Sequence, residues 1–205
     1  NKHISYYIMN RFRKKAKDDK MNHLEIEYKT LLNKQEYQSL LSLFTDTPLV
    51  IQTNHYIDTP DQLIRSQKMA LRVRTFKDAA ELTLKVPEVV GHFEYNQDLS
   101  PEETEAILQQ HEFPDGEIKN LLKTKEIPVE QLAVWGSLTT ERLEKDTAAG
   151  LVALDHSLYL DTEDYELEIE VETAEQEANF HQFIKEHGIV YKPAINKIAR
   201  LAERL

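Results

Sequence analysis

Apolar and polar residues alternate along much of this chain with the two-residue period of β-strands. The first such stretch, residues 23–29, reads HLEIEYK and places its apolar residues on one face of a strand. The other face carries two acids and a base, Glu25, Glu27 and Lys29. Short connections favour antiparallel hairpins between the further strands that the pattern predicts, over residues 49–58, 69–77, 80–87, 91–99, 132–146, 150–161 and 164–172.

Helical spacing of apolar residues fills the gaps between these strands. A helix over about 34–44 begins with an Asn33–Glu36 capping box, and a second begins at Ser100. Three more are predicted over 115–123, from Thr173 to Gly188, and in the C-terminal PAINKIARLAERL. About eight antiparallel strands can close on themselves. We therefore expect an α+β fold, a closed eight-stranded antiparallel β-barrel that forms a tunnel, with helices packed on its outside.

Charged residues recur on one face of several predicted strands. The acids lie on the first and last strands, and the bases lie on the strands between them, among them Arg72, Arg74, Lys85 and Arg142. Each face taken alone is compatible with a sheet that has one side in water. The separation of acids from bases favours a different arrangement, in which the charged faces point into the barrel.

A charged lumen needs a charged ligand, because desolvating so many ionised groups is otherwise costly. Clustered carboxylates prefer hard divalent cations such as Mg²⁺ or Mn²⁺. Clustered Arg and Lys side chains suit phosphate oxygens. A metal ion beside basic side chains is the equipment of phosphoryl-transfer chemistry.

Charge and composition narrow the class of protein. The net charge of −11 argues against a general nucleic-acid binder, and no apolar run is long enough for a membrane span. We find no signal peptide and no cysteine, so a cytoplasmic protein is expected. Residues 1–20 carry a net charge of +5, and we interpret them as a basic extension before a working start at Met21. Residues 21–205 are then expected to form a single domain.

The segment EIEYK, residues 25–29, resembles the E-x-E-x-K signature of the CYTH domain, the triphosphate tunnel metalloenzymes. The resemblance covers about residues 22–202 and is greatest to small stand-alone CYTH proteins of Gram-positive bacteria. Further blocks follow in family order: HYIDTPDQLI, LRVR, TLKVP, TERLEK, VALD, YELEIE and NKIARL. This superfamily includes class IV adenylate cyclases, thiamine triphosphatases and inorganic tripolyphosphatases.

The resemblance implies roles for individual residues. Lys29 and Glu27 would act in catalysis. The triphosphate would be bound by Lys29, Arg72, Arg74, Lys85, Arg142 and Lys197. The metal, Mg²⁺ or Mn²⁺, would be held by Glu25, Glu27, Asp155, Glu166 and Glu168. Two departures stand out: a further acid allows Glu168/Glu170 as an alternative metal pair, and His92 lies where many relatives have an arginine.

The function expected from this resemblance is metal-dependent hydrolysis of a triphosphate. Inorganic tripolyphosphate is the first candidate, and a nucleoside or thiamine triphosphate is the second. A class IV-type adenylate cyclase and a non-catalytic polyphosphate or nucleotide sensor remain alternatives. The expected partner is a small-molecule triphosphate rather than nucleic acid or a membrane, and the protein is expected to be a monomer or a homodimer.

Overall fold

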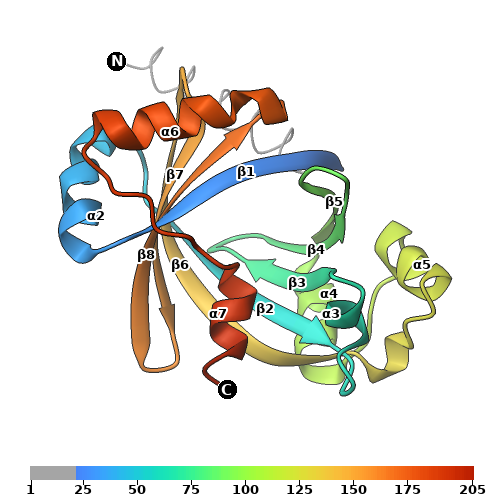
Figure 1. The fold of residues 1–205 in the computed structure, drawn as a ribbon. Helices are drawn as coiled ribbons and strands as arrows, with labels where there is room; N and C mark the ends of the chain where they lie inside the picture. Colours follow the sequence, from blue (N-terminus) through green and yellow to red (C-terminus); the bar gives the residue numbers. More distant parts are fainter. Residues whose placement is uncertain (1–21) are drawn as a thin grey trace, which may run out of the picture.

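The computed structural model describes residues 22–205, which form a closed antiparallel barrel of eight strands with helices on its outside (Figure 1). This confirms the predicted fold, whereas the predictions for residues 1–20 and Met21 lie outside the described residues. Around the barrel the strands follow the order β1-β5-β4-β3-β2-β6-β7-β8. Their bounds are β1 His23–Leu32, β2 Val50–Asp58, β3 Ala70–Thr75, β4 Ala80–Pro87, β5 His92–Leu99, β6 Ala133–Thr147, β7 Gly150–Tyr159 and β8 Thr162–Val171.

Strand β1 closes the barrel by pairing with two strands that are distant in sequence. Its first residues pair with β5, where Glu25 lies opposite His92, and the rest pairs with β8, where Lys29 lies opposite Glu168. The β4–β5 turn approaches β1 closely at Gly91, which has a φ of +73°. A Cβ atom there would lie 2.1 Å from the backbone oxygen of Glu25. Only glycine fits both conditions, so this turn fixes the backbone from which the Glu25 side chain projects.

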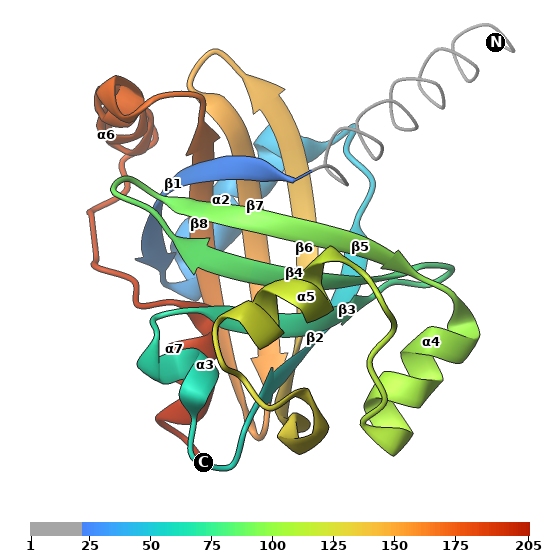
Figure 2. The same ribbon diagram turned by 90° about the vertical axis from the view of Figure 1, so that its right-hand side faces the viewer.

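Helices cover the barrel on two sides and bury the apolar faces of the strands (Figures 1 and 2). One core lies beneath α2 (Lys34–Leu40) and α6 (Glu177–Glu186), where Phe180 packs with Leu167 and Ile169 of β8. A second core lies beneath α4 (Pro101–Glu105) and α5 (Glu117–Thr124). Within residues 22–205, none of the helices combines the length and apolar character that a membrane span requires.

The helix starts agree with the capping signals of the sequence. Asn33 and Ser100 each accept a hydrogen bond from the backbone three residues on, and Glu36 and Glu103 complete the two boxes. The predicted helix over 34–44 continues from α2 as a 3₁₀ turn, Leu41–Phe44.

Two short helices complete the fold and bear on the site. The four-residue α3 (Leu63–Ser66) lies between β2 and β3 and was not predicted, because four residues carry too little periodicity to detect. The C-terminal amphipathic segment forms a helix only from Lys197, as α7 (Lys197–Ala202). Leu201 of α7 is buried in a small cluster with Tyr56 and Leu138 of the barrel.

Candidate functional site

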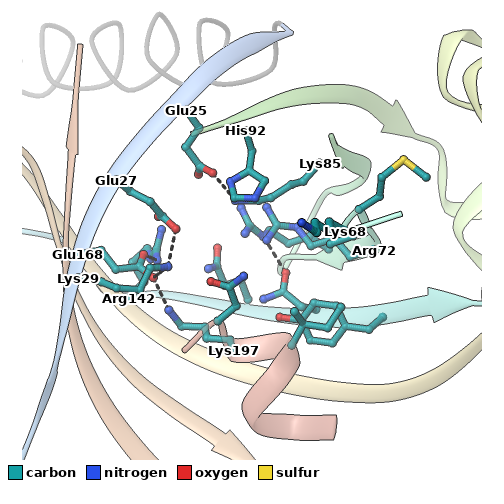
Figure 3. Close-up of a pocket in the computed structure, with 18 residues that line it drawn as sticks. Glu25, Glu27, Lys29, Lys68, Arg72, Lys85, His92, Arg142, Glu168 and Lys197 are labelled. Atoms are coloured by element: carbon teal, nitrogen blue, oxygen red, sulfur yellow. Dashed lines mark hydrogen bonds and ion pairs between the residues drawn. The ribbon is translucent and has the colours of Figure 1, made fainter. Parts of the chain in front are cut away.

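The barrel encloses a cavity of about 140 Å³ whose walls are mostly charged (Figure 3). Of the eleven residues that the sequence predicted for the site, all but Asp155 and Glu166 line this cavity. The nine lining residues are Glu25, Glu27, Lys29, Arg72, Arg74, Lys85, Arg142, Glu168 and Lys197. The charged faces of the strands therefore point inward, and the reading of a sheet with one side in water is wrong for these residues.

The acids of β1 each contact a lysine within the lumen. Glu27 accepts a hydrogen bond from Lys29, and Glu25 accepts one from Lys85 of β4. Burial raises the pKa of Glu25, and the nearby charge of Glu27 raises it further. Burial and Glu168 would also raise the pKa of Glu27, but Lys29 and Lys85 outweigh them and lower it. Glu27 is therefore held as a carboxylate.

Three buried acids of β7 and β8, Asp155, Glu166 and Glu168, form a second group. One carboxylate oxygen from each lies within 4.8 Å of the other two. The ammonium nitrogen of Lys197 contacts all three, at 2.8 Å from Asp155, 2.6 Å from Glu168 and in close contact with Glu166. A single cationic atom thus already lies where three carboxylates converge.

The pKa values of Glu168 and Glu166 are shifted in opposite directions. Burial would raise the pKa of Glu168, but Lys197, Arg142 and Lys29 hold it well below its ordinary value. Burial raises the pKa of Glu166 to about 7, although Lys197 opposes the shift. Arg142 makes a bidentate contact with Asp155, at 2.8 Å and 2.6 Å, and also contacts Glu168. Arginine and lysine therefore neutralise this group together.

The donor set suits a hard divalent cation. All the candidate ligand atoms are carboxylate oxygens, and the contacts of Lys197 show that three of them converge on one point that a cation can occupy. Within residues 22–205, the group contains Glu166 and not Glu170. Glu170 instead lies 3.8 Å from His23, and burial raises its pKa to about 7.

Arg72 and Arg74 supply a basic wall on β3. Arg72 lies 3.6 Å from Glu94, and its Nε is buried without a hydrogen-bond partner among residues 22–205. Arg74 donates to Asn54 at 2.9 Å, and burial together with the charge of Arg72 lowers its pKa. A buried donor without a partner and neighbouring like charges both favour an anion in the lumen.

Several residues that line the tunnel, or that contact its lining residues as Glu94 does, were not predicted from the sequence. Glu94 is 6% exposed and contacts Lys85 at 2.8 Å, and alternation on β5 could have revealed it beside His92. Neutral Gln52, Asn54 and Tyr56 of β2 line the same cavity but carry no charge signal. Lys68 lines its edge from a turn, where no periodicity applies.

Comparisons with known proteins agree with this architecture. The CYTH domain matches residues 23–202 of the chain. "Putative triphosphatase YjbK" of Bacillus subtilis (strain 168) is 37% identical over 183 residues, which are 88% of this chain and 95% of the relative. A crystal structure from Bacillus halodurans, described as a "putative adenylate cyclase", is 37% identical with a TM-score of 0.83 and covers 87% of this chain and 97% of its own.

A more distant structure supports the fold alone. HpAC1 from Hippeastrum, described as a "putative adenylyl cyclase" that "reveals a dominant" triphosphatase activity, is 20% identical with a TM-score of 0.74. It covers 90% of this chain and 96% of its own. The match to the CYTH domain spans nearly all the described residues, and the E-x-E-x-K strand, the closed barrel and the charged lumen fit it. The chain belongs to the CYTH family.

Proposed function

We propose that this protein is a divalent-metal-dependent triphosphatase that hydrolyses a phosphoanhydride bond of a triphosphate held in the tunnel. Inorganic tripolyphosphate is the first substrate we expect, since the basic side chains of the tunnel can bind phosphate oxygens directly and its carboxylates can do so through a metal ion. The observation that carries the proposal is the convergence of six basic side chains and a carboxylate group inside one closed barrel. The names of YjbK and HpAC1 point in the same direction.

The basic side chains would bind the phosphate chain. Arg72, Arg74 and Arg142 offer planar, multiply donating guanidinium groups, and Lys85 and Lys197 offer point charges. In the free protein most of these cations contact carboxylates, so a bound phosphate chain would replace some of those contacts. The buried, unpartnered Nε of Arg72 is the donor that would gain most.

The carboxylates would hold Mg²⁺ or Mn²⁺, with Glu25, Glu27, Asp155, Glu166 and Glu168 as the candidate ligands. When bound, the cation supplies Lewis-acid polarisation of a phosphoryl oxygen. We place Lys29 and Glu27 at the reacting phosphate. Lys29 would stabilise negative charge that develops on the phosphoryl oxygens, and ionised Glu27 would accept a hydrogen bond from the attacking water and orient it.

Phosphate release from tripolyphosphate, with Mg²⁺ or Mn²⁺, tests the proposal. We expect orthophosphate and pyrophosphate to appear only when a divalent metal is present, with ATP and thiamine triphosphate assayed in parallel. Formation of cyclic AMP and pyrophosphate from ATP would identify an adenylate cyclase instead. Tight binding of tripolyphosphate without turnover under any metal would identify a sensor and overturn the enzymatic proposal.

A further inference from the structure

The C-terminal helix α7 carries a buried cation besides Lys197. This is Arg200, which is 7% exposed and lies three residues after Lys197. Lys197 points toward Glu168 inside the tunnel (Figure 3). Residues three apart lie on the same face of a helix, so Arg200 also faces the strands of the barrel. Arg200 belongs to the NKIARL block, but neither the charge pattern nor the resemblance gives it a role.

The guanidinium group of Arg200 binds two acids of β8 that share a strand face. Nη1 donates to Oε2 of Glu166 at 2.6 Å, and Nη2 donates to Oδ1 of Asp164 at 3.3 Å. Nε lies 3.0 Å from Oδ2 of Asp164, as an ion pair without the geometry of a hydrogen bond. Because the guanidinium group is planar, these contacts together fix its orientation between the two acids.

Two further groups hold this arrangement in place. The hydroxyl group of Tyr159, at the end of β7, donates to Oδ2 of Asp164 at 2.7 Å. Nη1 of Arg200 also donates to the backbone oxygen of Ile195 at 2.7 Å, on the segment that leads into α7. Arg200 is thus held by β8, by β7 through Asp164, and by its own segment.

The carboxylate of Glu166 is divided between two cations. Its Oε2 accepts from Arg200, whereas its Oε1 contacts Lys197 at the point where Asp155 and Glu168 also converge. A glutamate side chain has several rotamers, and the contact with Arg200 favours one that turns the other oxygen toward this point. Arg200 therefore orients a candidate metal ligand from behind.

Stability alone explains this network poorly. Buried ion pairs lose much of their mutual attraction to the cost of desolvating the charges. An apolar residue can pack α7 against the barrel, as Leu201 does in its cluster with Tyr56 and Leu138. Groups that bind a metal ligand from behind orient that ligand, and their loss typically weakens metal binding by about 10–100-fold.

We infer that Arg200 is a positioning residue for the metal site and acts through Glu166. It binds one oxygen of Glu166 and thereby presents the other where the three carboxylates converge, while Asp164 and Tyr159 hold the guanidinium group in place. This inference rests on the proposed function, which makes Glu166 a ligand of Mg²⁺ or Mn²⁺. It adds a residue behind the tunnel lining to those that set the metal affinity.

Arg200→Lys tests the inference, because a lysine keeps the charge but offers one donor atom in place of the planar fork. We expect Kd for Mn²⁺, measured by calorimetry without substrate, to rise about tenfold or more. Kd for tripolyphosphate, measured with a chelator and no metal, should stay within twofold, since Lys197 keeps its place. A helix that merely came loose would displace Lys197 and weaken both. Arg65→Lys, at an exposed position of α3, is the matched control.

Two further variants test whether the effect passes through Glu166. In a Glu166→Gln background, Arg200→Lys should change Kd for Mn²⁺ by less than about twofold, because the residue on which it acts has already been altered. Asp164→Asn keeps Arg200 and Glu166 but weakens the contact that orients the guanidinium group. It should raise Kd for Mn²⁺ by a smaller factor, and it decides the question if circular dichroism shows that Arg200→Lys does not fold.

The inference and the triphosphatase proposal fail in different ways. Binding of Mn²⁺ by Arg200→Lys, or by Asp164→Asn in its place, with the Kd of the parent would overturn the inference. Equal losses of Mn²⁺ and tripolyphosphate binding would also overturn it, since Arg200 would then only anchor α7, and so would an undiminished effect in the Glu166→Gln background. If the parent binds Mn²⁺ but hydrolyses no triphosphate, while Arg200→Lys selectively weakens Mn²⁺ binding, the triphosphatase proposal fails and the positioning role stands.

Discussion

At the scale of single residues, the tunnel replaces an apolar core with interlocking charges. Each base on β3, β4 and β6 that lines it lies near an acid, such as Glu81 at 3.5 Å from Arg74 and Glu94 at 2.8 Å from Lys85. Removing a base therefore affects ligand binding and folding differently. A lost cation weakens anion binding, while the remaining cations repel one another less.

Arg72→Ala and Arg74→Ala test whether a tunnel base matters more for ligand binding than for folding. Each should weaken tripolyphosphate binding by about 1.5–3 kcal/mol, because a charge-assisted contact is lost. The free energy of unfolding should change little in Arg74→Ala, since repulsion between Arg72 and Arg74 is relieved. It should fall more in Arg72→Ala, because buried Glu94 then loses one of its two cationic partners. Calorimetry and urea titration measure the two quantities, and Lys185→Ala on the exposed face of α6 is the control. Two unfolded variants would mean that the arginines serve the fold.

The acids should behave as one metal site. Glu27→Gln is nearly isosteric and should leave the fold intact, while turnover collapses and the metal concentration for half-maximal activity rises. Glu168→Gln should act in the same way, and the double variant should lose far less than the sum of the two single losses. Glu170→Gln should be milder, because Glu170, unlike Glu27, does not line the tunnel and also lies outside the group of three acids. Normal activity of Glu27→Gln at a low metal concentration would show that Glu27 is not a metal ligand.

Glu94 should oppose substrate rather than bind it. Its carboxylate neutralises Lys85 and Arg72 in the free protein, and these cations hold the pKa of Glu94 far below its ordinary value although burial opposes the shift. Glu94→Gln should reduce the stability of the free protein by about 1–3 kcal/mol. Tripolyphosphate should bind the variant more tightly, as judged by calorimetry. Weaker binding instead would show that Glu94 orients the two bases for the ligand.

At the scale of elements, the alternation of apolar and polar residues predicted the strands, and the capping residues predicted the helix starts. A two-residue period marks strands with one charged face, and the Asn33 and Ser100 boxes mark helix starts. The four-residue α3 is too short to show a helical period in the sequence. It is held in place by backbone hydrogen bonds to the Asp58 carboxylate. The lumen residues of β2 were missed for a related reason. Asn54 and Tyr56 lie on the same face of the strand, as the two-residue period predicts. Because their side chains are neutral, however, the sequence pattern gives no sign that this face lines a charged cavity.

The β4–β5 turn offers a test of how an element positions the site. Gly91→Ala places a methyl group against the backbone oxygen of Glu25 and also strains a left-handed φ. Gly188→Ala strains a similar φ of +67°, but among residues 22–205 no atom beyond its immediate chain neighbours lies within 4 Å of its Cβ position. We expect Gly188→Ala to cost about 1–2 kcal/mol with activity unchanged. Gly91→Ala should cost more and also reduce activity by displacing Glu25. Equal effects would mean that the turn does not position β1.

At the scale of the whole molecule, the number of strands in the sequence predicted a closed barrel but not which strands pair to close it. The pairing of β1 with both β5 and β8 depends on contacts between residues far apart in the chain, which periodicity does not encode. The same limit hid the convergence of Lys197 on three acids of other elements. The family resemblance predicted that a C-terminal lysine lies at the tunnel. It gave no indication that this lysine would lie among the acids.

The paired charges of the free barrel make a prediction about the molecule as a whole. If the bases alone bind the phosphate chain, tripolyphosphate should stabilise the fold even in the presence of a metal chelator. At a ligand concentration of 100 times Kd the gain is about 2.7 kcal/mol, which corresponds to a rise in Tm of roughly 5–10 °C for a protein of this size. Sodium sulfate at matched ionic strength controls for general salt effects, and Arg72→Ala should reduce the shift. Stabilisation that appears only with Mg²⁺ would mean that the metal holds the phosphates, while the bases remain engaged with their carboxylates.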